Sequence, residues 1–367
     1  MPEGSIHMID LAEYGWNAAL AAAFEECAEE GLVPGRVIKQ ARDRSTLVTA
    51  RGEVAGEVSG RFRHCALGPA DYPAVGDWAV LRPVRGGPAL IEAILPRRSA
   101  FTRKAAGEAV EAQIVAANVD TVFLVSGLDG DFNLRRIERY LTTAWSSGAD
   151  PVIVLNKADL RPDIRDVVAA VASVAPGVPV VLASALAAGG LKDIEPFLVP
   201  GRTVALLGSS GVGKSTLINR LLGEERFVTA PMSDAAAGRG RHTTTARELV
   251  RLPGGALLID TPGMRELQLW TDDEALDRTF DEIDGLATRC RFPDCRHERE
   301  PGCAVRAAVK DGALDVRRLE SYLKLRRELR FMELKKDVKT RRQEEKATGR
   351  RFATMLKEVK KHKPRYQ

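Results

Sequence analysis

The stretch Gly208-Ser209-Ser210-Gly211-Val212-Gly213-Lys214-Ser215 lies between an apolar run at residues 203–207 and an amphipathic run at residues 216–222. A glycine-rich turn between a strand and a helix, ending in Lys-Ser, is the pattern of a phosphate-binding loop. Its glycines allow backbone conformations that surround a phosphate with N–H groups at the positive end of a helix. We expect Lys214 to reach the β- and γ-phosphates of a nucleotide, Ser215 to bind Mg²⁺, and Thr216 to line the same site.

Length and composition indicate an ordinary globular protein. The chain has 367 residues, of which 44% are hydrophobic and 29% charged, which suits two or three domains. No apolar run reaches the roughly 18 residues that span a bilayer. Acidic residues such as Asp10 and Glu13 interrupt the stretch where a secretory signal would lie. We therefore expect a cytoplasmic monomer that does not act at a membrane.

The charge is distributed unevenly along the chain. Residues 317–367 hold 19 Lys and Arg against 7 Asp and Glu, a net charge of +12. Because the whole chain carries +5, the remainder carries −7. A basic tail on a mildly acidic body predicts contact with a polyanion at one end, although a solvated tail without a partner is the alternative.

Five short β-type runs separated by Gly, Pro and Asp turns occupy the region before residue 98. This pattern predicts a small Greek-key barrel of the OB type. We expect Arg61, Phe62, Arg63 and His64 on its open face, where such barrels bind oligonucleotides, unless the barrel only supports its neighbour. The expected division of the chain is an N-terminal segment (1–32), the barrel (33–98), a linker (99–112), a nucleotide-binding domain (113–272), a helical module (273–334) and a basic tail (335–367).

The middle of the chain alternates apolar runs with helical patterns, including a helix expected around residues 191–197. This alternation predicts a parallel α/β sheet covered on both faces. Asn156-Lys157-Ala158-Asp159 follows one of its strands. The Asp159 carboxylate can accept two N–H groups of guanine, a donor pair that adenine lacks. Asn156 would brace the site, the stem of Lys157 would lie along the base, and a backbone N–H of Ser184-Ala185 would meet the guanine oxygen.

Further nucleotide elements lie downstream of the phosphate loop. Asp260-Thr261-Pro262-Gly263 follows an apolar run, so Asp260 is expected to hold Mg²⁺ and the Gly263 N–H to sense the γ-phosphate. One residue of Thr243-Thr244-Thr245 should close over Mg²⁺, and we assign Thr244. The guanine motif precedes the phosphate loop, the reverse of the usual GTPase order. A circularly permuted GTPase domain is therefore predicted, which is possible because domain termini often lie close together.

Three cysteines and one histidine follow the GTPase motifs in the pattern Cys290-x4-Cys295-x-His297-x5-Cys303. Three thiolates and an imidazole complete a tetrahedral set, which is typical of a closed structural zinc site. A catalytic zinc would need an open position, and free buried cysteines are the other alternative. We expect one structural Zn²⁺ in addition to the Mg²⁺ that accompanies GTP or GDP.

With these motifs in this order, the chain resembles the bacterial GTPases that depend on the small ribosomal subunit, the RsgA/YjeQ family. The resemblance covers the barrel, the permuted GTPase motifs and the zinc spacing. It implies a GTPase stimulated by the small (30S) subunit that binds 16S rRNA late in subunit maturation and leaves on GTP hydrolysis.

The resemblance also bears on catalysis. Many GTPases position water with a Gln directly after the switch glycine, but here that residue is Met264. In the family a histidine just before the switch threonines is implicated, and the matching residue is His242. Two alternatives stay open at this point: a nucleotide-gated RNA-binding protein with weak hydrolysis, and a GTPase that acts on another RNA or a membrane surface.

Overall fold

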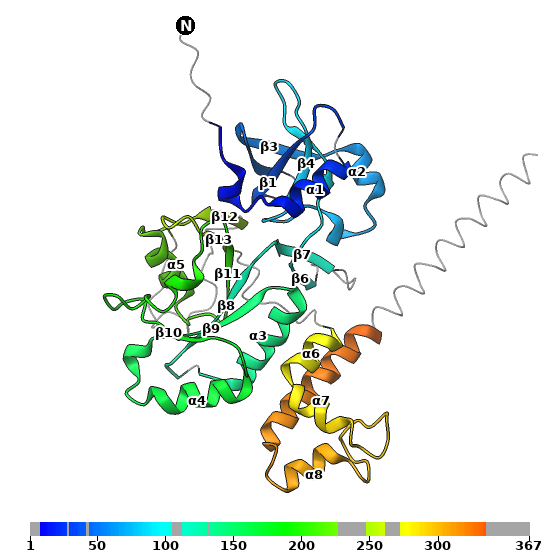
Figure 1. Ribbon diagram of the computed structural model, residues 1–367, viewed down its shortest axis with the longest axis vertical. Helices are drawn as coiled ribbons and strands as arrows, with labels where there is room; N and C mark the ends of the chain where they lie inside the picture. The colour runs from blue at the N-terminus through cyan, green and yellow to red at the C-terminus, as the bar shows by residue number, and fades with distance from the viewer. Residues whose placement is uncertain are drawn as a thin grey trace, which may run out of the picture.

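The computed structural model describes residues 8–27, 29–41, 44–104, 112–130, 132–226, 247–260 and 272–334 (Figure 1). A β-barrel, an α/β domain and a helical module follow one another along the chain, as the sequence predicts. None of the helices in these ranges has both the length and the apolar content needed to cross a membrane.

Five strands close the N-terminal barrel. They are β1 (Val33–Gln40), β2 (Ser45–Thr49), β3 (Gly52–Val58), β4 (Trp78–Arg82) and β5 (Ala89–Ile94). They pair in the order β1-β2-β3-β5-β4, and β4 pairs back with β1, so the sheet has no open edge. Only the β3–β5 pair is parallel. Val37, Leu47, Leu81 and Ile91 fill the interior, which confirms the predicted barrel.

The structure places Arg61, Phe62, Arg63 and His64 on the short helix α2 (Gly60–Cys65) and not on a strand. The helix begins there because the Ser59 hydroxyl accepts the Phe62 N–H at 3.0 Å. Phe62 packs against the barrel interior, with its ring centroid 5.9 Å from that of Tyr72. A short 3-10 turn, η2 (Pro69–Asp71), follows. These four candidates for the nucleic-acid face thus lie on a helix beside the barrel, and their contact with nucleic acid stays a prediction.

The N-terminal segment packs on the outside of the barrel. It forms η1 (Leu11–Tyr14) and α1 (Ala18–Cys27). The rings of Trp16 and of Trp78 in β4 pack edge-to-face, with their centroids 4.8 Å apart. Leu20 and Phe24 belong to the same apolar cluster. Large aromatic side chains thus attach this segment to the barrel.

Part of the expected linker is a β-hairpin. Strand β6 (Ala100–Lys104) pairs antiparallel with β7 (Ala112–Ala117). Phe101 and Val115 are buried in the main core, so the hairpin packs into the body of the protein.

The α/β domain is built on six strands. They are β8 (Thr121–Gly127), β9 (Asp150–Asn156), β10 (Val180–Leu182), β11 (Thr203–Leu207), β12 (Arg247–Arg251) and β13 (Leu257–Asp260). Their order is β10-β9-β8-β11-β13-β12, and all neighbours are parallel except β12 and β13. The predicted parallel sheet is thus confirmed, with one antiparallel strand at its end.

Helices cover both faces of this sheet. The apolar residues of α3 (Leu134–Ser147) and α4 (Ile164–Val174) belong to the core on one face, and those of α5 (Lys214–Leu222) to the core on the other. Short 3-10 turns are η3 (Ala158–Leu160) and η4 (Glu195–Phe197). The helix expected around residues 191–197 is therefore only η4.

The barrel and the α/β domain share one continuous sheet. Strand β12 pairs antiparallel with β1, and Lys39 and Glu248 form an ion pair of 2.7 Å across this junction. Arg36 of β1 is buried beside it and donates to the Thr203 hydroxyl of β11 at 2.8 Å. Burial lowers the pKa of Arg36 to about 10, against the opposing charges of Asp120 and Asp77.

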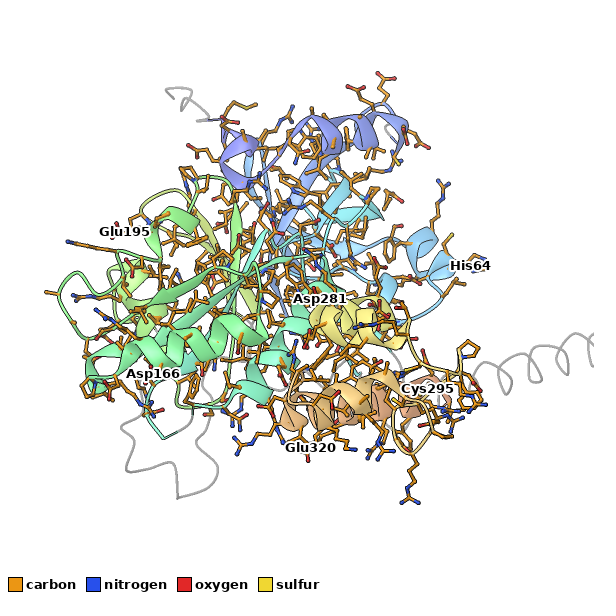
Figure 2. The ribbon with its side chains drawn as sticks, turned by 60° about the horizontal axis from the view of Figure 1, so that its bottom comes forward. His64, Asp166, Glu195, Asp281, Cys295 and Glu320 are labelled. Atoms are coloured by element: carbon orange, nitrogen blue, oxygen red, sulfur yellow. The ribbon has the colours of Figure 1, made fainter. Side chains whose placement is uncertain are left out.

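Four helices form the C-terminal module. They are α6 (Asp273–Thr279), α7 (Asp281–Ala287), α8 (Ala304–Lys310) and a helix over residues 316–334. Their core includes Leu276, Phe280, Ile283, Val305 and Tyr322. The module lies against α3 of the α/β domain, as the two views show (Figures 1 and 2).

Candidate nucleotide site and metal centre

The phosphate loop connects β11 to α5 at the carboxyl end of the sheet. Gly211 and Gly213 have φ angles of 84° and 93°, which only glycine adopts without strain. Gly208 passes so close to β8 that a Cβ there would lie 2.4 Å from the Val125 carbonyl oxygen. These glycines let the loop pass close against the sheet and lead directly into α5, and the N-terminus of a helix preceded by such a loop is where an anion can bind.

Lys214 is buried at the start of α5, with 7% of its surface exposed. Its ammonium donates to the carbonyl oxygen of Gly208 at 2.5 Å and to that of Ser209. The lysine charge is therefore held across the loop, where it can reach nucleotide phosphates. Ser215 and Thr216 follow on the first turn of the same helix.

The Asn-Lys-x-Asp motif lies beside this loop, because β9 ends at the same edge of the sheet. Asn156 is 1% exposed, and its Nδ2 donates to the Val212 carbonyl oxygen at 2.8 Å. Lys157 Nζ donates to the Gly211 carbonyl oxygen at 2.8 Å and pairs with Asp129. The candidate base pocket and the phosphate loop are thus joined by direct hydrogen bonds.

Asp159 and the Ser184-Ala185 segment come together next to Asn156. The Ser184 hydroxyl lies 2.5 Å from Asp159 Oδ1 and also accepts the Ala187 N–H at 3.3 Å. The Ala185 N–H faces Asn156 Oδ1 at 3.4 Å. One oxygen of Asp159 is therefore held by Ser184, so the other can face a base.

The expected magnesium ligands Ser215 and Asp260 stand on neighbouring elements. Strands β11 and β13 are parallel, with Ala205 opposite Ile259, so Asp260 ends its strand beside the start of the loop. This is the arrangement that a P-loop serine and a Walker-B-type aspartate require. The remaining expected site residues, His242, Thr244 and Gly263, lie outside the described residues.

Two residues at this site have no counterpart among the expected site residues. Asp129 follows β8, which lies between β9 and β11, and it pairs with Lys157. Its place at the carboxyl end of a central strand is a signal that could have identified it. Tyr140 of α3 has its hydroxyl 3.3 Å from the Ser209 hydroxyl, and no sequence motif marks it.

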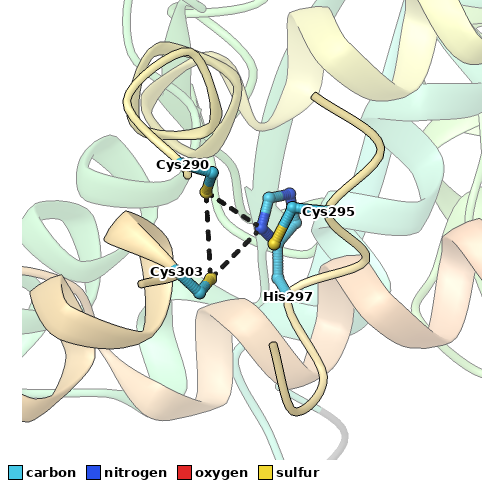
Figure 3. Close-up of side chains that lie close together, drawn as sticks. All are labelled: Cys290, Cys295, His297 and Cys303. Carbon is cyan, nitrogen blue, oxygen red and sulfur yellow. Dashed lines mark hydrogen bonds between the residues drawn. The ribbon is translucent and has the colours of Figure 1, made fainter. Parts of the chain in front are cut away.

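The four expected metal ligands converge in the C-terminal module (Figure 3). Their ligand atoms all lie within 4.8 Å of one another. His297 Nδ1 is 3.6 Å from Cys290 Sγ and 3.4 Å from Cys303 Sγ, and these two sulfurs are 3.9 Å apart. Tetrahedral bonds of about 2.0–2.3 Å to zinc place ligands about 3.5–3.8 Å apart, so the cluster fits such an ion.

The loop between Cys295 and Cys303 is shaped by Glu300. The Glu300 carboxylate accepts the backbone N–H groups of Arg296, Glu298 and Arg299 at 2.9–3.0 Å. The N–H of Glu300 itself, followed by those of Arg299 and Arg296, lowers the pKa of the Glu300 carboxyl to about 2. His297, with a φ of 60°, sits at the turn, and burial together with Arg326 lowers the pKa of its imidazole. A neutral imidazole is the form that binds a metal.

Comparison with known proteins identifies the family. Residues 94–270 match the family model described as RsgA GTPase. A relative from Opitutus terrae, named small ribosomal subunit biogenesis GTPase RsgA, is 56% identical over 328 residues, covering 87% of this chain and 89% of that protein. The chain belongs to the RsgA GTPase family. An RsgA relative from Lactiplantibacillus plantarum, 47% identical, covers 98% of this chain and 99% of its own length.

Solved structures agree with the fold. The crystal structure of YjeQ from Thermotoga maritima matches with a TM-score of 0.61 and 28% identity, covering 81% of this chain and 98% of that one. YloQ, described as a circularly permuted GTPase, matches with a TM-score of 0.57 and 24% identity, over 84% and 96%. The predicted family, fold class and enzyme class are confirmed: the chain is an RsgA GTPase, a GTP-hydrolysing enzyme with a permuted domain.

Proposed function

We propose that this GTPase works on the small (30S) ribosomal subunit, contacting its 16S rRNA late in maturation and leaving when GTP is hydrolysed. The observation that carries the proposal is the direct connection of the guanine motif to the phosphate loop, through Asn156 to Val212 and Lys157 to Gly211. This geometry supports binding of a guanine nucleotide. The relatives' names supply the particle on which it would act.

In this proposal the roles divide as follows. Asp159 selects guanine, Asn156 and Ser184 hold that pocket, and Lys214 binds the phosphates. Mg²⁺ is held by Ser215 and Asp260 with Thr244, and Gly263 contacts the γ-phosphate. The remaining nucleotide contacts come from Lys157, Ala185, the loop residues 208–213 and Thr216.

The zinc-binding module would provide an RNA contact. Cys290, Cys295, His297 and Cys303 would hold one structural Zn²⁺, which stabilises the loop and performs no chemistry, since all four tetrahedral positions are filled by the protein. Four arginines in and beside this loop are exposed: Arg289, Arg291, Arg296 and Arg299. Clustered guanidinium groups contact phosphates, so this surface supports binding to rRNA.

The water-positioning group is proposed to be His242, since Met264 cannot orient water. His242→Ala should reduce subunit-stimulated GTP turnover while leaving the affinity for GTP nearly unchanged. An equal loss of affinity would assign His242 a structural role instead. We further propose that the protein acts as a cytoplasmic monomer.

Co-sedimentation tests the proposed partner. The protein should pellet with small subunits in the presence of a non-hydrolysable GTP analogue, less so with GDP, and not with large subunits. Arg291→Ala with Arg296→Ala should weaken this binding, whereas Arg165→Ala, an exposed arginine on α4, should not. Equal pelleting with both subunits, or none with either, would contradict the proposal.

A further inference from the structure

Helix α3 is in contact with three different parts of the protein. One side carries Ile137, Leu141 and Ala144, which are buried in the core under the sheet. A second side faces the C-terminal module, and a third reaches the phosphate loop. Because successive helical residues are rotated by about 100°, these sides belong to residues that alternate along the same two turns.

The side facing the module contains a buried charge network. Glu138 is 2% exposed, and its carboxylate accepts a hydrogen bond from the Arg318 guanidinium at 2.8 Å and another from the Ser321 hydroxyl. Arg318 also donates to Glu282 at 2.5 Å and to the Thr279 carbonyl oxygen at 2.6 Å. A buried ion pair of this kind requires its partners to keep their positions, because a shift would leave a charge unpaired. The module is therefore held at one position on α3.

Further contacts between the module and α3 follow along the helix. The Thr142 hydroxyl lies 3.1 Å from that of Thr279, and Arg139 donates to both oxygens of Glu328 at 2.7 Å. The guanidinium of Arg278 stacks 3.5 Å above the centre of the Trp145 ring. The module thus holds α3 over its whole length.

Tyr140 lies within the same turns but points to the nucleotide site. Its hydroxyl is 3.3 Å from that of Ser209, whose carbonyl oxygen accepts the Lys214 ammonium. Ser209 is the second residue of the phosphate loop. A displacement of α3 by the module would therefore reach the loop through this contact between the Tyr140 and Ser209 hydroxyls.

We propose that Tyr140 is a positioning residue. Through its contact with Ser209, the position of the C-terminal module on α3 affects how tightly the phosphate loop binds its nucleotide. The side of α3 that is involved contacts the chain's own C-terminal module, and the change in nucleotide affinity is transmitted through the phosphate loop. This inference rests on the proposed nucleotide site.

A double-mutant cycle on GDP binding tests the inference, using full-length protein and calorimetry. Tyr140→Phe removes one hydroxyl contact and should weaken GDP binding about 2- to 12-fold, the range expected for one hydrogen bond. Ser321→Ala and Glu328→Gln each weaken a contact between the module and α3, and each should therefore weaken GDP binding. In the Tyr140→Phe background both should have no further effect, because the connection is already broken. Unfolding temperature, recorded in parallel, should be unchanged in Tyr140→Phe.

Two matched controls accompany the cycle. Tyr72→Phe removes a tyrosine hydroxyl from the barrel surface, and Arg165→Gln removes the charge of an exposed arginine on α4, outside the contact between α3 and the module. Neither should change GDP affinity. Unchanged GDP affinity in Tyr140→Phe, or additive losses in the cycle, would overturn the inference while the nucleotide site stands. Failure of the unmodified protein to bind GDP would overturn both.

Discussion

Asp159→Asn separates base recognition from phosphate binding, and the structure predicts how the new amide would orient. The Ser184 hydroxyl accepts the Ala187 N–H, so its own proton is available to Asp159 Oδ1 at 2.5 Å. The amide oxygen of the variant should therefore remain on Ser184. Its NH₂ group then takes the place of Oδ2 and meets a guanine N–H donor instead of accepting it.

The magnitude follows from the one hydrogen bond that is lost. A bond to a charged group contributes about 1.5–3 kcal/mol, and about 1.4 kcal/mol is a tenfold change. GDP affinity should therefore fall about 10- to 150-fold. Xanthine carries a carbonyl where guanine has its exocyclic amine, so XDP can accept from the new NH₂. XDP should bind the variant more tightly than it binds the unmodified protein.

Titration calorimetry with GDP and XDP on both proteins measures this exchange. Asp163→Asn is the matched control, since Asp163 is an exposed aspartate just after the motif and should leave both affinities unchanged. Unchanged GDP affinity in Asp159→Asn would remove this carboxylate from the base pocket. Equal losses for GDP and XDP would show that it has only a structural role.

Three further predictions concern the loop and the module. Gly208→Ala places a Cβ 2.4 Å from the Val125 carbonyl oxygen, and overpacking of about 1–3 kcal/mol should weaken GDP binding about 5- to 150-fold; Gly60→Ala, which meets nothing within 4 Å, should not. Burial raises the pKa of Glu282, but the hydrogen bonds and charge of Arg318 outweigh it and hold that pKa below its usual value. The ion pair therefore stabilises the fold above the usual glutamate pKa of about 4.3, and this stability is lost as the pH falls below it; thermal melts of Glu282→Gln should show a flatter acid dependence, and identical slopes would contradict this. Removing zinc with a chelator should unfold the module, measured as lost helical circular dichroism, while GDP still binds with an affinity reduced no further than in Tyr140→Phe; purified protein without bound zinc would refute the metal centre.

The short motifs were predictable because each needs particular residues at fixed local spacing. The Gly208–Ser215 loop and the Cys290–Cys303 pattern each lie within one short segment, so their chemistry is visible in the sequence. The hydrogen bond that joins Asn156 to Val212 could not be predicted, although both motifs were predicted to follow strands of a parallel sheet.

Features that depend on contacts between residues far apart in the chain could not be predicted from the sequence. The β1–β12 junction and the Glu138–Arg318 ion pair link residues far apart along the chain, and no local pattern signals either. The segment 99–112 reads as polar and basic because its strand carries Thr102 and Arg103, yet Phe101 anchors it in the core. Residues 61–64 resemble a nucleic-acid face by composition, but the Ser59 cap turns them into a helix.

We propose that this permuted GTPase responds to the small ribosomal subunit. Steady-state GTP turnover, measured with and without purified small subunits at physiological salt and with large subunits as a control, tests it most directly. Turnover should rise strongly when small subunits, but not large ones, are present. Turnover that is unchanged by small subunits, or raised equally by large ones, would contradict it.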